Sequence, residues 1–309
     1  MASKSISIII PTKDRAPILE KTIEALSVSV KGLDYEVIVV NDSKTAPVVL
    51  APGLMAGHIR IIDNPKQGVA SARNLGASQA GKEWLLFLDD DMIILEENFR
   101  SYLNYTDMAE KLCVNVEWVY TPEMLTEINK NAFGRFLIKY GFTTMRGWSN
   151  YPDWPENSAV PVSSMSSPNL FIRKADFVST GGYDEAFPFA GFEDYAFSKR
   201  LEQHGFHMYV DTTSLMYHNE SDRLEPLQWY ERKRRGSETR KIAVEQGFGE
   251  VGVVYGPVQK FVYSNQAILR PVVSGIVSVS SHFRFLDALS FACYKVLLGM
   301  TIFKGYTKK

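Results

Sequence analysis

A short apolar run that ends in three carboxylates is the feature that most constrains this chain. Residues 85–92 read Leu-Leu-Phe-Leu-Asp-Asp-Asp-Met, which predicts a buried strand with Asp89, Asp90 and Asp91 at its end. Clustered carboxylates there cost free energy through repulsion and desolvation unless a positive charge lies among them. A hard divalent cation shared with a phosphate would supply that charge. The alternative is a helix N-terminus, which favours Asp by capping and through its dipole.

Composition bounds the class of protein. The chain has 309 residues, 45% of them hydrophobic, and a net charge of -1, which is typical of a soluble globular protein. A charge so close to zero gives no support for a nucleic-acid partner. Cys113 and Cys293 form neither a disulfide framework nor a metal-ligand pattern, which fits a reducing compartment such as the cytoplasm. The first eleven residues lack the features of a signal peptide.

Strand and helix patterns alternate over the first 95 residues. Strands are predicted at residues 6–10, 35–40, 58–62 and 84–88, and helices at residues 17–30 and 69–80. This order with short connections predicts an α/β fold with a mostly parallel, Rossmann-like sheet and helices on both faces. In open α/β sheets, ligands bind at the carboxyl ends of the strands.

The remainder divides into an irregular middle, a second regular stretch and a helical tail. Residues 99–161 are predicted to be irregular, with an aromatic loop at 145–155 that either lines a substrate pocket or packs on the surface. Strands are predicted at 169–173 and 207–210, and helices at 174–179 and 192–205. The predicted domains are 1–222, with halves 1–95 and 96–222, and a C-terminal helical extension, 223–309.

The tail carries both charge and apolar surface. A basic cluster occupies 232–235, and the apolar stretch 283–303 is interrupted by Asp287 and Lys295, so it is not predicted to span a membrane. Two interpretations stay open. The helices either make peripheral contact with a membrane surface or pack on protein, including a second subunit in a homo-oligomer.

Two further positions follow the pattern of a ligand site. Asp42 ends the second predicted strand, where it would accept a hydrogen bond from a base or a ribose hydroxyl, or else cap a turn. Arg73 lies in a glycine-led helix start at 68–74, from which a guanidinium could reach a phosphate or a base. A surface arginine is the alternative.

Two positions in the second half suggest acid–base or ligand chemistry. Glu193 and Asp194 follow Gly191 at a predicted helix start, where a carboxylate can act as a general base or simply favour the helix dipole. His218 follows the last strand, and its imidazole would complete a metal shell, touch a diphosphate, or be structural.

These segments, in this order, resemble the inverting family 2 glycosyltransferases, which have the GT-A fold. The segments are Ile-Ile-Ile-Pro-Thr-Lys-Asp-Arg at 8–15, Val-Val-Asn-Asp-Ser at 39–43, the stretch 68–74, Leu-Asp-Asp-Asp at 88–91, and 181–185 with 191–194. Asn41 replaces the first aspartate of the second motif, so only Asp42 is carried over. The resemblance covers about residues 5–220.

The resemblance implies roles for particular residues. Implied donor-side or substrate contacts are Pro11, Thr12, Arg15, Asp42, Arg73, Asp89, Asp90 and Glu193. Asp91 and His218 are the implied ligands of Mn²⁺ or Mg²⁺, and Asp194 is the implied catalytic base.

The implied activity is metal-dependent, inverting transfer of a single sugar. The donor would be a nucleotide-diphosphate sugar, taken as a UDP-sugar, and the acceptor a hydroxyl of a glycan or a lipid-linked glycan. The Gln-x-x-Arg-Trp signature of processive synthases is missing. A nucleotidyltransferase is disfavoured because residues 11–17, after the first strand, hold no glycine. A catalytically inactive nucleotide-sugar-binding or scaffold protein stays as the alternative.

Overall fold

The computed structural model describes residues 4–54, 57–108, 110–148 and 153–308. The chain divides into two compact units. The first unit comprises Met1–Val119 and Pro152–Asn219, and the second comprises Tyr120–Tyr151 and Glu220–Lys309. Unlike the predicted division at residue 222, this one groups the segment 120–151 with the C-terminal helices. The assignment of a catalytic domain and an extension stays a prediction.

The first unit is built on a mixed nine-stranded sheet within the described residues. The strands are β1 (Ser5–Thr12), β2 (Asp34–Asn41), β3 (Ile59–Asp63), β4 (Trp84–Leu88), β5 (Met92–Ile93), β6 (Leu112–Tyr120), β7 (Ala159–Pro161), β8 (Asn169–Arg173) and β9 (His207–His218). Their order is β3-β2-β1-β4-β8-β6-β9-β5, with β7 beside β9.

The sheet changes direction at β4. Strands β3, β2, β1 and β4 are parallel, with Thr12 paired to Asn41 at the ends of β1 and β2. Strand β8 runs antiparallel to β4, and β5 and β7 run antiparallel to β9. The predicted α/β class and the predicted parallel pairing of the first four strands are confirmed. The parallel strands end at one edge, where Thr12, Asn41 and Leu88 mark the last positions.

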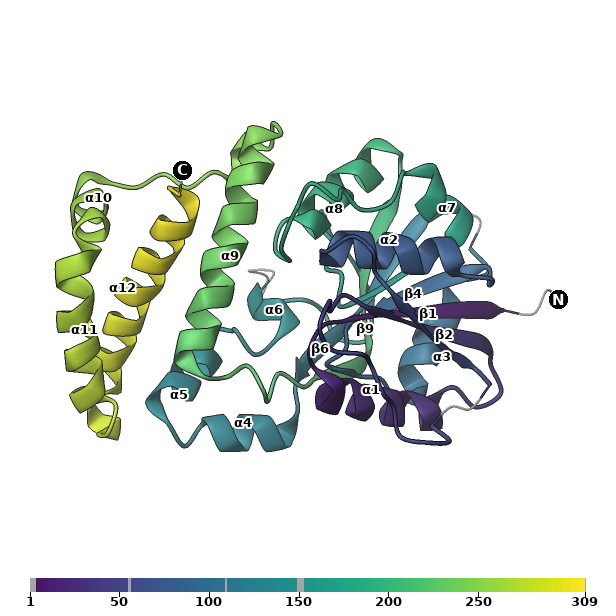
Figure 1. The fold of residues 1–309 in the computed structure, drawn as a ribbon, viewed down its shortest axis with the longest axis horizontal. Coiled ribbons are helices and arrows are strands. Elements are labelled where there is room, and N and C mark those ends of the chain that lie inside the picture. Colours follow the sequence, from purple (N-terminus) through teal and green to yellow (C-terminus); the bar gives the residue numbers. More distant parts are fainter. Residues whose placement is uncertain (1–3, 55–56, 109, 149–152, 309) are drawn as a thin grey trace. The chain divides into compact units, whose positions relative to one another are not determined.

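Helices cover both faces of this sheet (Figure 1). Helices α2 (Val69–Gln79), α7 (Lys174–Ser179) and α8 (Glu193–Gln203) lie on one face, and α1 (Ala16–Ser29) and α3 (Glu96–Asn104) lie on the other. Side chains such as Ile9, Phe87 and Phe197 form a continuous buried cluster under α2, α7 and α8. Burial of this apolar surface is the main stabilising contribution in the unit.

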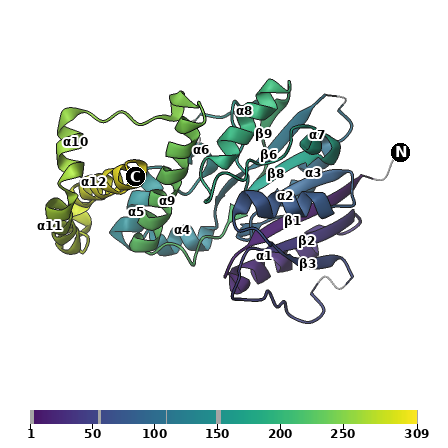
Figure 2. The same cartoon turned by 45° about the horizontal axis from the view of Figure 1, so that its top comes forward.

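The second unit is helical. Its elements are α4 (Pro122–Ile128), α5 (Ala132–Lys139), α6 (Met145–Trp148), α9 (Pro226–Glu245), α10 (Pro257–Ser264), α11 (Gln266–Ser280), α12 (Asp287–Tyr306) and the short 3₁₀ turns Gly249–Val251 and Arg284–Leu286. Figure 2 shows α9, α11 and α12 from a second direction. Phe136 of α5, Trp229 of α9 and Tyr294 of α12 belong to one aromatic core. Arg135 ties α5 to the start of α12 by bonds of 2.7 and 2.6 Å to Asp287.

The prediction of an irregular middle was wrong for most of its length. Residues 99–161 contain most of α3, the long buried strand β6, helices α4, α5 and α6, and β7. Strand β6 escapes a pattern-based prediction because Asn115 interrupts its apolar run. That amide is satisfied in the interior, where it donates to the Ser166 carbonyl at 2.9 Å. Positions 149–152 of the predicted aromatic loop lie outside the described residues.

The last predicted strand was also too short. Strand β9 extends to His218 instead of ending at Val210. Its second half contains Thr213 and Ser214, which read as a turn by composition. These hydroxyls bond to Ser101 of α3 at 3.1 and 2.8 Å, so the strand continues with its polar groups satisfied.

One helix among the described residues, Arg284–Tyr306, is long and apolar enough by composition to cross a membrane. Core packing accounts for part of that apolar character, because 39% of the apolar window is buried inside the protein. Phe291, Leu297 and Met300 are buried among the aromatic residues of α5 and α9. This helix is thus partly packed within the protein, and both expectations for 283–303 stay predictions.

We expect Gly76→Ala to destabilise the first unit. A Cβ at Gly76 would lie 2.3 Å from Ile9 Cγ2 and 3.2 Å from Val40 Cγ2, so α2 would have to move off the sheet. Overpacking of this kind costs about 1–3 kcal/mol, which exceeds the gain of up to about 1 kcal/mol in helix propensity. The measurement is the thermal unfolding midpoint.

Gly275→Ala in α11 is the matched control, because nothing lies within 4 Å of its added Cβ. It should leave the midpoint unchanged or raise it. A Gly76→Ala protein as stable as the parent would contradict the close packing of α2 on β1.

Candidate active site

Strand ends and helix starts of the first unit converge on one group of polar residues. Thr12 ends β1, Asp42 follows β2, and Asp89–Asp91 follow β4. The parallel register brings these ends to the same edge of the sheet. Asp42 also accepts from the Gly68 amide that opens α2, at 3.0 Å. The fold therefore brings Thr12, Asp42 and the three aspartates to one edge of the sheet.

Asp90 is an internal anchor rather than an exposed ligand. Its carboxylate accepts from Thr12 Oγ1 at 2.7 Å and pairs with Arg15. Its carbonyl accepts from Thr22 Oγ1 at 2.7 Å, and the residue is 5% exposed. These bonds fix the turn after β4 to β1 and α1. The substrate contact predicted for Asp90 stays a prediction, while its observed bonds are structural.

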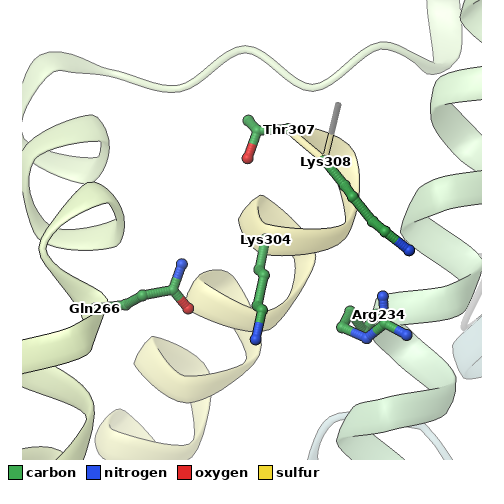
Figure 3. Close-up of a pocket in the computed structure, with 5 residues that line it drawn as sticks. All are labelled: Arg234, Gln266, Lys304, Thr307 and Lys308. Carbon is green, nitrogen blue, oxygen red and sulfur yellow. The ribbon is translucent and has the colours of Figure 1, made fainter.

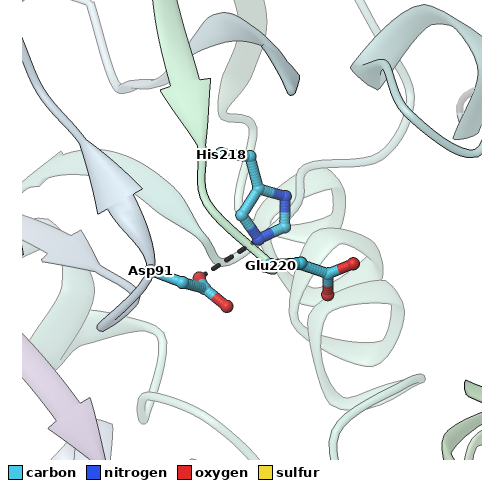
Figure 4. A group of neighbouring side chains, drawn as sticks. All are labelled: Asp91, His218 and Glu220. Atoms are coloured by element: carbon cyan, nitrogen blue, oxygen red, sulfur yellow. Dashed lines mark ion pairs between the residues drawn. The ribbon is translucent and has the colours of Figure 1, made fainter. Parts of the chain in front are cut away.

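Asp91 lies between a guanidinium and an imidazole. Arg15 Nη1 is 2.9 Å from Asp91 Oδ2, and His218 Nε2 is 3.1 Å from Asp91 Oδ1 (Figure 4). The pairing of Met92 with His218 in β5 and β9 brings the two side chains together. The ring of Trp118 meets the imidazole edge-on, with centroids 4.8 Å apart.

This pair fits a divalent cation. Two ligands about 2.1 Å from one octahedral ion stand about 3 Å apart when they are adjacent, and carboxylate oxygen suits Mg²⁺ and Mn²⁺. The 3.1 Å separation meets that condition, although an ordinary hydrogen bond has the same length. Glu220, also drawn in Figure 4, begins the second unit, where it pairs with Arg232 at 2.9 Å.

Arg73 connects the aspartate cluster to α8. Its side chain is 2% exposed, with Nη2 2.8 Å from Asp89 Oδ1 and Nη1 3.1 Å from Glu193 Oε1. The guanidinium also lies 5.4 Å from the ring centroid of Tyr183. Burial works to lower the pKa of Arg73, but the nearby carboxylates raise it overall, so it stays charged. The surface-arginine alternative was wrong, and the predicted contact with a nucleotide stays a prediction.

Asp194 stands next to this link, in the first turn of α8. Its Oδ1 accepts from the Tyr195 amide at 2.8 Å, and Ser198 Oγ donates to its carbonyl at 2.8 Å. Burial raises the pKa of Asp194 to about 8, and the negative charge of Glu193 adds to the rise while Arg73 opposes it. A carboxyl group with such a pKa can exchange a proton near neutral pH.

Asp42 is held at the start of α2. It accepts from Asn64 Nδ2 at 2.7 Å, and Lys13 Nζ is 3.5 Å from its other oxygen. Gly68 has a φ of +124°, a conformation that a residue with a Cβ rarely adopts. Pro11, which the resemblance also places on the donor side, is buried in β1 opposite Val40.

The sequence did not predict three residues that hydrogen-bond to the site, namely Thr22, Asn64 and Ser198. Thr22 gave a usable signal, because it sits four residues after Ile18 and four before Leu26 on the buried stripe of α1. A polar residue at a core position of an amphipathic helix needs a hydrogen-bond partner. Asn64 and Ser198 carried no comparable signal.

The profile of Glycosyl transferase family 2 matches residues 7–160. This chain is a family 2 glycosyltransferase. An uncharacterized glycosyltransferase from Haemophilus influenzae is 27% identical over 69% of this chain and 67% of its own length. The validoxylamine A glucosyltransferase of Streptomyces hygroscopicus subsp. jinggangensis is 28% identical over 68% of this chain and 54% of its own.

Similarity to solved structures extends further along the chain but is more distant. S. aureus TarS residues 1–349 align with 95% of this chain and 90% of that chain, at 15% identity and a TM-score of 0.47. The chain spans about half the length of the validoxylamine relative.

Arg73→Gln should unfold the first unit at markedly lower temperature. Removal of one partner from a buried ion pair leaves Glu193 uncompensated and costs about 3–5 kcal/mol. Arg60→Gln is the matched control, because Arg60 pairs with Glu36 at 3.1 Å while 46% exposed. Exposed pairs contribute about 0–1 kcal/mol. Equal unfolding midpoints for the two variants would contradict the bridging role of Arg73.

Proposed function

We propose that this family 2 glycosyltransferase moves a single sugar from a UDP-sugar to a hydroxyl of a glycan or lipid-linked glycan, with inversion. The observation that carries the proposal is the position of Asp194. It is a carboxyl group with a raised pKa, joined through Glu193 and Arg73 to the aspartates at the strand ends. A proton acceptor thus stands close to the group of residues that suits a donor diphosphate.

Asp194 serves as the general base in this proposal. Its carboxylate would take the proton of the acceptor hydroxyl while that oxygen attacks the anomeric carbon and the bond to the diphosphate breaks. Proton transfer to a positioned base contributes about 10²- to 10⁴-fold to rate. A single displacement with the base and the leaving group on opposite sides inverts the configuration of that carbon.

The donor would lie along the parallel strand ends. Asp42, with Lys13 beside it, would contact the base or the ribose, and Asp89, whose side chain is 28% exposed, would also contact the donor. Asp91 and His218 would hold Mn²⁺ or Mg²⁺. A divalent cation held by these two residues would supply positive charge to offset the negative charge of the leaving diphosphate.

Transfer of one sugar, rather than polymerisation, is supported by a relative's name. The Streptomyces hygroscopicus relative is called a glucosyltransferase acting on validoxylamine A. We take the site of action to be the cytoplasm, because Cys113 and Cys293 are both free and buried. An inactive nucleotide-sugar-binding protein is the second candidate, and it would bind a donor without turnover.

Asp194→Asn should abolish transfer and leave donor affinity within about twofold. The parent enzyme should show kcat/KM rising with pH through about 8, because the base must lose its proton and its pKa lies there. Both are measured by release of the nucleoside diphosphate across a pH series. Glu202→Gln, an exposed substitution on the same helix, should keep the parent's rate and profile. An equal loss of donor binding in Asp194→Asn would contradict the base role.

Nucleotide binding should depend on the metal. A ligand that binds only the native state raises the unfolding midpoint, so UDP with Mn²⁺ should raise it more than UDP with EDTA. Asp91→Asn should remove the metal-dependent part of the shift. GDP, dTDP and CDP serve as comparisons. If one of them raises the unfolding midpoint more than UDP does, that nucleotide takes the place of UDP in the proposal. No shift with any nucleotide would contradict donor binding itself.

A further inference from the structure

Helix α11 carries an apolar stripe that faces away from its unit's core. Ile268, Val272, Ile276 and Val279 are 72%, 58%, 39% and 64% exposed, and their spacing puts them on one side of the helix. Leu269, Val273 and Val277 instead pack against the aromatic core. The helix is therefore apolar on its outer side as well as its inner side.

The neighbouring segments extend this exposed apolar surface. Val258 and Phe261 of α10 are 76% and 69% exposed, and Phe283 and Phe285 after α11 are 48% and 81% exposed. Single exposed apolar side chains are ordinary, but a concentration of them along successive segments of a soluble protein marks an interaction site. We use the name apolar face for the exposed apolar side chains within residues 258–285, which belong to α10, α11 and the turn after them.

Charge is distributed very unevenly along the chain. Residues 257–309 contain seven Lys and Arg and one acid, Asp287, which gives a net charge of +6. The other 256 residues contain 27 basic and 34 acidic side chains, a net charge of -7. The one acid is itself paired with Arg135. Within residues 258–285, Lys260, Arg270 and Arg284 give a net charge of +3 with no acidic side chain, so the segment with the exposed apolar side chains is itself cationic.

Part of this charge lines a pocket on another side of α11 (Figure 3). The pocket encloses about 490 Å³ between Arg234, Gln266, Lys304, Thr307 and Lys308. Lys304 extends from α12 into it. An adjoining pocket adds Arg270 of α11. Glu238 offsets the charge of Arg234 and Lys308, with its carboxylate 2.9 Å from Lys308 Nζ.

We propose that the apolar face docks on the surface of a bilayer containing anionic lipids. The α11 stripe would enter the boundary between headgroups and acyl chains, and the surrounding lysines and arginines would lie at the level of the phosphates. Membrane docking goes beyond the proposed transferase reaction and does not depend on it.

Length and charge favour this occupant over two others. Helix α11 has 15 residues with Pro271 inside, short of the roughly 20 needed to cross a bilayer. A second copy docking through the same face would bring two surfaces of net charge +3 together, which opposes association. Anionic lipid supplies both an apolar phase and the complementary charge.

The test is flotation of the full chain with vesicles. The protein should float with vesicles of phosphatidylcholine and phosphatidylglycerol at low salt, bind much less to phosphatidylcholine alone, and dissociate as salt rises. Val272→Asp should weaken binding to the mixed vesicles by about tenfold or more, the equivalent of about 1.4 kcal/mol. Val178→Asp is the matched control, because Val178 is 61% exposed on α7 of the first unit.

Circular dichroism of both variants keeps folding separate from binding. Equal flotation of a folded Val272→Asp and Val178→Asp would overturn the proposal, as would failure of the parent to float with anionic vesicles. Binding unaffected by salt or by phosphatidylglycerol would overturn the role of charge. If the parent instead fails to bind vesicles and sediments as a dimer that Val272→Asp loses, the partner of the apolar face would be a second copy of the chain and not a bilayer.

Discussion

The organisation of the first unit depends on compensation of buried negative charge at the end of β4. Three aspartates and Glu193 converge there, and two buried arginines, Arg15 and Arg73, neutralise them. Without those guanidiniums, desolvation and repulsion would oppose the close approach of β1, β4 and α8. The same electrostatic requirement that shapes the fold gathers these polar side chains at the strand ends, where we propose that the donor binds.

The parallel half of the fold was predictable because its signals are local. Each strand from β1 to β4 is a short apolar run closed by a polar or turn residue, and Ile18, Leu19, Ile23 and Leu26 mark the inner face of α1. The antiparallel half was less predictable. Strands β6 and β9 contain polar residues whose hydrogen-bond partners lie far along the chain, and no local pattern reveals such partners.

The candidate site shows the same limit. Its residue types and order identified the family and the carboxylates, but not which partner each buried carboxylate meets. Asp90 and Asp91 are neighbours in sequence, yet Asp90 is fixed by Thr12 and Asp91 meets His218. The link from Arg73 to Glu193 joins residues 120 positions apart, so it emerges only from the tertiary structure.

That shared guanidinium also limits how the enzyme can diverge. Because Arg73 pairs with Asp89 on one side and Glu193 on the other, the segment that contains α2 and β4 and the segment that contains α8 cannot be exchanged between relatives as independent modules. A chimera could join residues 1–95 of one enzyme to α8 of another. Its buried charges would be mismatched unless Arg73 and both carboxylates, Asp89 and Glu193, were present in the combined chain. Selection for a new acceptor should therefore spare these three positions and alter the surrounding loops first.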